Sequence, residues 1–213
     1  PGTQPWSPGW SDNPLDSLGN LGSINGDSTA STEAVRDAMD KAGIPPGSPV
    51  MMASHSQGGM ISQALLSDPT FTERFNVTHS VTYGSPVDAI PDTSDARQLH
   101  LQHRGDVVPR VDLGNAPRVS RLDDDATVVT LDNPQTAWAY DPTWNDQPGI
   151  QLPSGPFPKD VLEAHSHKNY ANSVAASDDP RITAFENDLD NFIVPAGDES
   201  KVTAVDVEIR RRK

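Results

Sequence analysis

The chain of 213 residues suits a single domain, residues 1–213, with a substantial core, and no apolar run reaches the roughly 18 residues that a membrane-spanning helix needs. Its formal net charge of -14 would repel nucleic acid, which excludes that class of partner. Cysteine is absent, which excludes disulfides and thiolate chemistry but leaves the compartment open, with an exported or cell-surface location among those allowed.

The first six residues have two interpretations, an ordinary terminal turn or a loop that leaves a central strand. In the second, Gly2 lets the backbone approach a reacting carbonyl group, and the backbone amide of Thr3 or of a neighbour can donate to an oxyanion. The strand itself would have to precede Pro1. The second interpretation therefore predicts an additional N-terminal segment that completes the sheet in the natural protein.

The stretch around residues 50–67 carries the strongest chemical signal. Four apolar residues, 50–53, predict a short buried strand, and residues 57–67 have helical spacing. A strand, a sharp turn with a serine at its tip and a helix together make a nucleophile elbow, with Ser56 as its serine. The alternative is a chance S-x-S-x-G motif on a loop, because short motifs recur without function.

A nucleophile elbow holds its serine in a strained backbone conformation, so the residues two positions before and two after the serine must be small. Ser54 and Gly58 meet that requirement around Ser56. The turn directs the Ser56 hydroxyl outward, and the amide of Gln57, at the N-terminus of the expected helix, points towards an oxyanion that forms beside it. Gln57 is therefore the first candidate oxyanion donor and Thr3 the second.

The remaining elements predict an α/β fold. Helical spacing precedes the elbow strand at residues 29–42, and β-branched and apolar residues indicate strands over residues 77–83, 98–103 and 126–131. This order favours a mostly parallel sheet flanked by helices, with its chemistry at the carboxyl ends of the strands.

The C-terminal part is expected to hold a long loop and three more elements. Residues 132–159 predict a loop with aromatic residues among prolines, which is either a lid or apolar wall over the site or a surface excursion pinned by its aromatic side chains. Helices are predicted from Ser166 to about residue 176 and over residues 181–192. Alternating apolar residues predict a half-buried edge strand over residues 203–210.

A serine nucleophile needs a base, and a carboxylate must orient that base and stabilise its cation. With an elbow of this kind, the chain order is nucleophile, acid, base. Asp106 directly follows a predicted strand, where a loop can raise its side chain to the edge of the sheet. Asp88 and Asp112 compete for this role, and an ordinary turn aspartate beside Gly105 is the structural alternative.

Histidine is the expected base, because its pKa lies near the working pH. His165 and His167 are the candidates. Ser166 can cap the helix that follows, which leaves His165 on the preceding loop, free to reach inward, and puts His167 in the first helical turn. This geometry favours His165, with His167 as the alternative base.

The other four histidines predict no separate chemistry. His55 lies inside the elbow, where its side chain must point away from the nucleophile and pack or support the site. His79, His100 and His103 belong to predicted strands, where structural hydrogen bonds usually satisfy a histidine. A zinc site built on the two candidate bases would lack the H-E-x-x-H spacing and any cysteine, so we expect no metal and no cofactor.

Four motifs occur here in an order typical of one family. They are Ser54-His55-Ser56-Gln57-Gly58-Gly59, Tyr83-Gly84-Ser85-Pro86, Arg104-Gly105-Asp106-Val107-Val108-Pro109, and His165 followed by Tyr170. Together they resemble the motif series of α/β-hydrolases related to the class 3 (fungal-type) lipases, with Ser54 in place of the usual glycine. The resemblance covers about residues 1–175 and implies an α/β-hydrolase fold that lacks its N-terminal strand or strands.

The resemblance implies Ser56 as nucleophile, Asp106 as acid and His165 as base, with the amides of Gln57 and Thr3 as oxyanion donors. It implies a serine hydrolase that cleaves carboxylic esters, of small molecules or lipids, through an acyl-enzyme. An acyltransferase, thioesterase or amidase with the same triad is the alternative, because the pocket selects the leaving group and the acceptor. A hydrolase-like module retained for binding is a second class, and a polysaccharide-binding domain that uses the tryptophans is a third.

Overall fold

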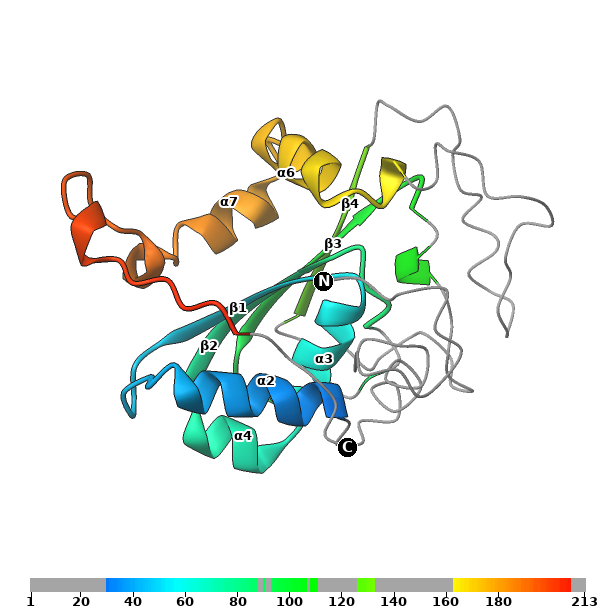
Figure 1. The fold of residues 1–213 in the computed structure, drawn as a ribbon. Helices are drawn as coiled ribbons and strands as arrows, with labels where there is room; N and C mark the ends of the chain where they lie inside the picture. The colour runs from blue at the N-terminus through cyan, green and yellow to red at the C-terminus, as the bar shows by residue number, and fades with distance from the viewer. Residues whose placement is uncertain are drawn as a thin grey trace.

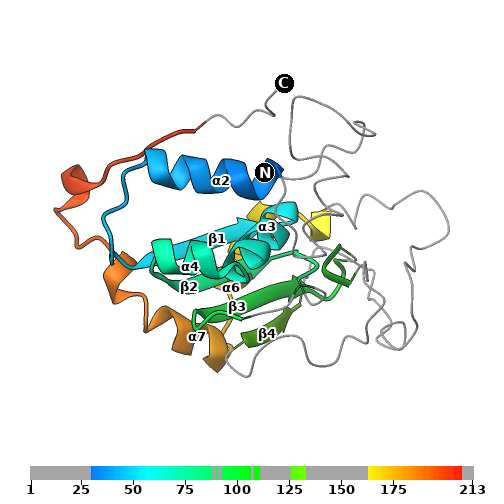
Figure 2. The ribbon, with the colours of Figure 1, turned by 90° about the horizontal axis from the view of Figure 1, so that it is seen from below.

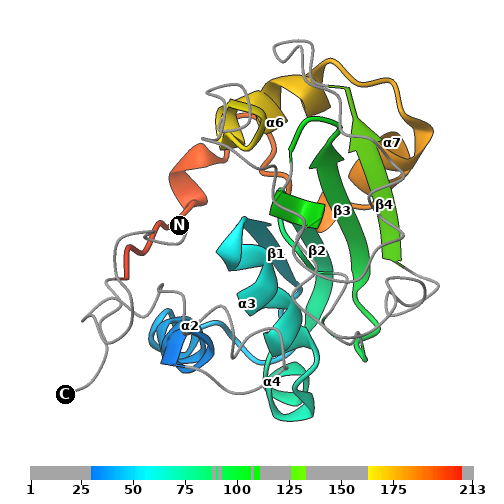
Figure 3. The same ribbon diagram turned by 90° about the vertical axis from the view of Figure 1, so that its right-hand side faces the viewer.

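A computed structural model describes residues 30–87, 90, 93–106, 108–110, 126–132 and 163–207 of the chain. Its centre is a sheet of four parallel strands in the order β1–β2–β3–β4 (Figures 1 and 3). The strands are β1 (Val50–His55), β2 (Val77–Tyr83), β3 (Arg97–His103) and β4 (Ala126–Leu131). The mostly parallel α/β fold predicted from the sequence is thereby confirmed.

Helices cover both faces of this sheet (Figure 2). The helices on one face are α2 (Ala30–Lys41), α3 (Gln57–Leu66) and α4 (Pro69–Arg74), and those on the other are α6 (His167–Ala175) and α7 (Pro180–Glu186). Short 3-10 helices are η1 (Val108–Arg110), η3 (Asp190–Phe192) and η4 (Glu199–Lys201). None of the helices in the described ranges has the length and apolar character that crossing a bilayer requires.

Each face of the sheet has its own apolar core. On the side of α3 and α4, the buried members are Ile61, Leu65, Phe71 and Phe75. On the side of α6 and α7, they are Leu99, Leu101, Val129, Leu131, Tyr170, Ile182 and Phe185. The two clusters pack against opposite faces of the sheet and hold its strands in place.

The register of the sheet brings the carboxyl ends of neighbouring strands to one edge. His55 pairs with Tyr83, Tyr83 pairs with Leu101, and His103 pairs with Leu131. Because the strands are parallel, the turns that leave β1, β2 and β3 lie side by side at this edge.

The elbow strand β1 is the outer strand of the described sheet. Among the described residues it pairs with β2 alone, and its side chains are partly or fully exposed, whereas most of β3 is buried. The additional N-terminal segment that the sequence predicts beside it stays a prediction, since residues 1–29 lie outside the described ranges. The same holds for the lid or wall predicted at residues 132–159, of which only Asp132 is described.

Near the C-terminus, one predicted helix is shorter than expected and one predicted strand is wrong. The helix expected over residues 181–192 ends at Glu186, because the Asn- and Asp-rich run that follows favours local turns over helix, and only η3 continues it. The edge strand expected over residues 203–210 is absent from its described part, residues 203–207. Val205 and Val207 are exposed there, and alternating apolar residues form no strand where no neighbouring strand supplies the ladder of hydrogen bonds.

Helix α4 is an element that the sequence reading missed. Asp68 precedes Pro69 and caps the helix, since its side chain accepts a hydrogen bond from the amide of Thr70 at 2.8 Å. An aspartate followed by proline is a recognised signal for the start of a helix, so this element could have been predicted.

A buried histidine lies on the face of the sheet that packs against α3. His100 is 4% exposed, and its Nδ1 and the Thr82 Oγ1 lie 2.7 Å apart in a hydrogen bond. Its Nε2 has no partner among the described residues. Burial lowers the pKa of His100 to about 4, so the folded protein keeps this ring neutral at neutral pH.

We expect the free energy of unfolding to fall as the pH drops from 6.5 towards 4, because the unfolded chain protonates His100 in this window and the folded chain does not. The difference corresponds to up to about 3 kcal/mol. Urea unfolding between these pH values measures it. The substitution His100→Leu should lessen the dependence, to which His55 and His103 also contribute because burial lowers their pKa values as well. His167→Gln, at an exposed histidine, is the control, and an equal slope in wild type and His100→Leu would contradict the assignment.

Candidate active site

Ser56 lies in the turn between β1 and α3, at the tip of the elbow. It has φ 56° and ψ -127°, and it is the one non-glycine residue with positive φ in the described ranges. Such a conformation costs about 1–3 kcal/mol and persists only where the surrounding structure enforces it. Here the Ser56 amide donates to the Tyr83 carbonyl at 3.1 Å, and the Ser56 carbonyl accepts from the Gly59 amide at 3.0 Å.

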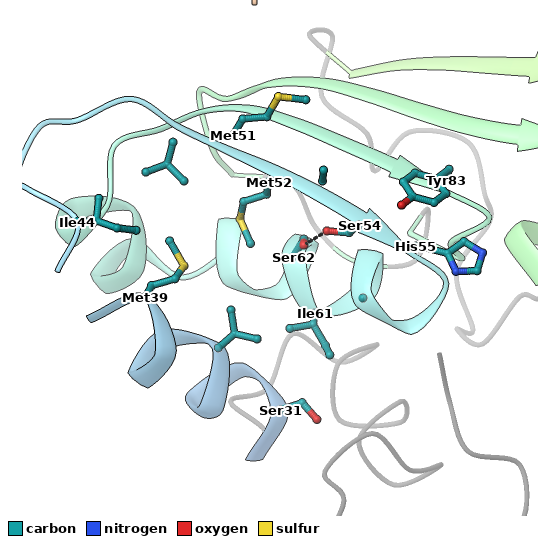
Figure 4. A pocket seen from close by; sticks show the side chains of 14 residues that line it. Ser31, Met39, Ile44, Met51, Met52, Ser54, His55, Ile61, Ser62 and Tyr83 are labelled. Carbon is teal, nitrogen blue, oxygen red and sulfur yellow. Dashed lines mark hydrogen bonds between the residues drawn. The ribbon is translucent and has the colours of Figure 1, made fainter. Parts of the chain in front are cut away.

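The steric requirement around the elbow falls on a different glycine from the one expected. A Cβ atom added to Gly58 would lie 3.8 Å from Ser54 Cβ, which is an ordinary contact. A Cβ atom added to Gly59 would lie 2.2 Å from Ser85 Oγ and 2.5 Å from Ser85 Cβ, and the second contact cannot be relieved without a shift of the backbone. Gly59 therefore lets α3 approach the end of β2. Ser54 hydrogen-bonds to Ser62 and ties β1 to α3 (Figure 4).

His165 bridges the elbow and a buried carboxylate. Its Nε2 lies 2.9 Å from Ser56 Oγ, and its Nδ1 lies 2.8 Å from Asp106 Oδ2. With the proton assigned to Nδ1, the ring donates to Asp106 and accepts from the Ser56 hydroxyl. This arrangement can take a proton from Ser56 and so activate it for attack on an electrophilic carbon.

Asp106 follows β3 and is fully buried. Its Oδ2 accepts hydrogen bonds from His165 and from the Tyr170 hydroxyl, the latter at 2.8 Å, and its Oδ1 accepts from the Val108 amide at 2.9 Å. A buried carboxylate that accepts several hydrogen bonds is held in place. The two competing aspartates, Asp88 and Asp112, lie outside the described residues.

Two neutral histidines hold the backbone that carries His165. His55 Nε2 donates to the His165 carbonyl at 2.8 Å, and His103 Nδ1 donates to the Ala164 carbonyl at 2.6 Å. Burial, together with the neighbouring His165, lowers the pKa of His55 to about 4, and burial lowers the pKa of His103 as well. Both rings are therefore uncharged at neutral pH. The sequence placed His55 as a supporting residue but gave no such role to His103.

The alternative base lies outside this array. His167 is the first residue of α6 and is exposed, and its ring centroid is 6.1 Å from that of His55. The structure thus brings His165, and not His167, to Ser56. The described residues contain no group of three His, Asp or Glu side chains that could hold a metal ion.

Gly84 directly follows β2 and lies at the site. The sequence shows it within a motif but does not indicate why a glycine is needed there. Its φ is 62°, and a Cβ atom added there would lie 3.0 Å from both Asp106 Oδ2 and His165 Nδ1. Any side chain at this position would press on the hydrogen bond between the carboxylate and the imidazole. The glycine therefore provides both the left-handed turn and the space for that bond.

Of the two candidate oxyanion donors, the structure describes one. Gln57 is the first residue of α3, directly after Ser56, so its amide belongs to the positive end of that helix. Thr3 lies outside the described residues, and its role stays a prediction.

An apolar cavity of about 490 Å³ lies along the outer flank of β1, between α2 and α3 (Figure 4). Met39, Met52 and Ile61 are among its lining residues. Ser56 and His165 do not line it, but His55, which donates to the His165 carbonyl, does.

Residues 30–136, half of the chain, match the model of a family described as the PGAP1-like alpha/beta domain. The matched range includes Ser56, Gly84 and Asp106 and ends before His165. No match was found among curated proteins or among solved structures.

We expect Gly84→Ala to slow the reaction of Ser56 with a fluorophosphonate probe by more than about tenfold, because the added methyl group displaces His165 or Asp106. Gly43→Ala is the matched control, since Gly43 also has positive φ (70°) but open space around it. Both variants should lose about 1 kcal/mol of stability in urea unfolding. Equal labelling rates in the two variants would show that the space at Gly84 is not needed.

Proposed function

The chain belongs to the family of PGAP1-like alpha/beta domains, part of the alpha/beta-hydrolase superfamily, and from this premise we propose that it is a serine hydrolase that cleaves carboxylic esters through an acyl-enzyme. The observation that carries the proposal is the His165 ring, with Ser56 Oγ at 2.9 Å from one nitrogen and Asp106 Oδ2 at 2.8 Å from the other. The four motifs that resemble those of class 3 lipases support esters as substrates.

In the proposed first step, Ser56 Oγ bonds to the ester carbonyl carbon while its proton moves to His165 Nε2. Asp106 stabilises the imidazolium ion that forms. The negative charge that develops on the carbonyl oxygen is stabilised by the Gln57 amide and the N-terminus of α3, with Thr3 as the proposed second donor. His165 then gives the proton to the departing alkoxide, which leaves an acyl group on Ser56.

In the proposed second step, water replaces the alcohol. His165 takes a proton from the water as its oxygen bonds to the acyl carbon, and it returns that proton to Ser56 Oγ as the carboxylic acid leaves. The tight hold on Asp106 suits both steps, because the carboxylate must face the same imidazole nitrogen throughout.

The same triad could act on thioesters or amides, or pass the acyl group to an acceptor other than water. Nitrophenyl esters of short and long acyl chains, with matched thioesters and anilides, separate these activities by their relative kcat/KM values. A module retained only for binding would leave Ser56 unreactive towards fluorophosphonates, because an unactivated serine does not react.

Replacing the nucleophile should abolish ester hydrolysis. We expect Ser56→Ala to lower kcat/KM for nitrophenyl acetate by at least about 10³-fold and to eliminate fluorophosphonate labelling. Ser54→Ala is the matched control, since it removes a neighbouring serine hydroxyl that bonds to Ser62 and not to His165. If Ser56→Ala kept full activity, the proposed nucleophile would be wrong.

The two candidate bases can be separated by the same assay. We expect His165→Gln to lower kcat/KM by at least about 10³-fold, because no other group takes the proton of Ser56. His167→Gln should stay within about twofold of the wild type. The reverse result would transfer the role of base to His167.

A further inference from the structure

Tyr170 lies in α6, five positions after His165, and is 1% exposed. Its hydroxyl donates to Asp106 Oδ2 at 2.8 Å and accepts from the His103 amide at 2.8 Å. Its ring stacks on that of His103, with centroids 3.8 Å apart and planes inclined by 13°. The hydroxyl is therefore fixed on the carboxylate by packing as well as by hydrogen bonds.

Tyr170 and His165 donate to the same carboxylate oxygen at the same distance. Both bonds to Asp106 Oδ2 measure 2.8 Å, whereas Oδ1 accepts from the Val108 amide. When one carboxylate oxygen accepts from two donors, each hydrogen bond offsets part of its negative charge. Each donor therefore weakens the hydrogen bond that the oxygen makes with the other donor. The phenol thus competes with the imidazole for the charge of the acid.

We propose that Tyr170 is a positioning residue for Asp106: its hydroxyl holds the carboxylate in the orientation that faces His165 and limits how strongly that carboxylate stabilises the imidazolium form. The proposal rests on the triad assigned above and deepens it. If Asp106 stabilised the imidazolium form of His165 too strongly, the ring would already carry a proton and could not accept the one from Ser56. A second donor on Asp106 weakens that stabilisation and keeps the imidazole neutral and available as a base.

Several other groups face His165 and must be kept constant in any test. From β1 comes His55, from β3 comes His103, and α6 contributes His167 beside Tyr170; each of these histidines interacts electrostatically with this cluster. The substitution Tyr170→Phe leaves all three in place and removes one oxygen atom, so it isolates the contribution of the hydroxyl.

We expect Tyr170→Phe to move the acid limb of the pH profile of kcat/KM upward by roughly 0.5 to 1 pH unit. Without the phenol, the full charge of Asp106 Oδ2 faces the imidazole, and His165 becomes neutral only at higher pH. The rate on the plateau should fall by about two- to tenfold, since the carboxylate is less well oriented. A merely structural role would lower stability or the plateau rate and leave the limb where it is.

Tyr83→Phe is the matched control. Tyr83 is a half-buried tyrosine whose ring lies 5.8 Å from that of Tyr170, and no hydrogen bond joins its hydroxyl to Asp106 among the described contacts. Tyr83→Phe also removes one phenol oxygen close to the site, and the acid limb of its pH profile should coincide with that of the wild type. If Tyr170→Phe and Tyr83→Phe gave the same limb, the proposal would be overturned.

A direct titration separates this proposal from the proposed function. The ¹⁵N resonances of the imidazoles, followed by NMR against pH without substrate, give the midpoint for His165, which is assigned by its absence from His165→Gln. That midpoint should be higher in Tyr170→Phe than in the wild type. An inactive wild type would refute the ester hydrolase, while the NMR midpoints would still decide whether Tyr170 acts on the pair.

Should Tyr170→Phe fail to fold, difluorotyrosine placed at position 170 provides a test of opposite sign. Its hydroxyl is more acidic and donates more strongly, so the midpoint for His165 should move downward. An unchanged midpoint in that variant would contradict the proposal.

Discussion

The hydrogen-bonded bridge from Asp106 through His165 to Ser56 is the interaction on which the rest of the site depends. It joins residues that are 59 and 109 positions apart in the chain. No local conformational preference can make such a contact, so the sheet and the helices on its faces must supply it. The proposed chemistry requires the imidazole to face the hydroxyl and the carboxylate at the same time. The fold must therefore bring three distant segments of the chain together.

The parallel sheet brings these segments together because the carboxyl ends of its strands lie at one edge. The elbow after β1, the left-handed Gly84 after β2 and Asp106 after β3 occupy neighbouring positions because the strands pair in register. The loop before α6 brings His165 to this edge. His55 and His103 hold the backbone at His165, and Tyr170 bonds to Asp106. The contacts of His103 and Tyr170 are buried, so loss of one partner leaves the other unsatisfied.

The elements of this fold could largely be predicted from periodicity, and the errors have physical causes. Strands and helices whose apolar residues reach the core were found within a few residues of their ends. The helix over residues 181–192 was predicted too long because spacing alone ignores the turn-forming preference of Asn and Asp. The strand over residues 203–210 was predicted from alternation, although a strand exists only beside another strand.

The sequence by itself predicted the elbow with Ser56 at its tip, the proposed order of nucleophile, acid and base, and the preference for His165 over His167 on the loop before α6. These follow from local rules of turns, caps and chain order. The tertiary structure alone decided that Gly59 and Gly84, rather than Gly58, are the positions without room for a side chain. It alone placed Tyr170 and His165 on one oxygen of Asp106, because which side chains meet across 60 residues depends on packing and register that no local pattern encodes.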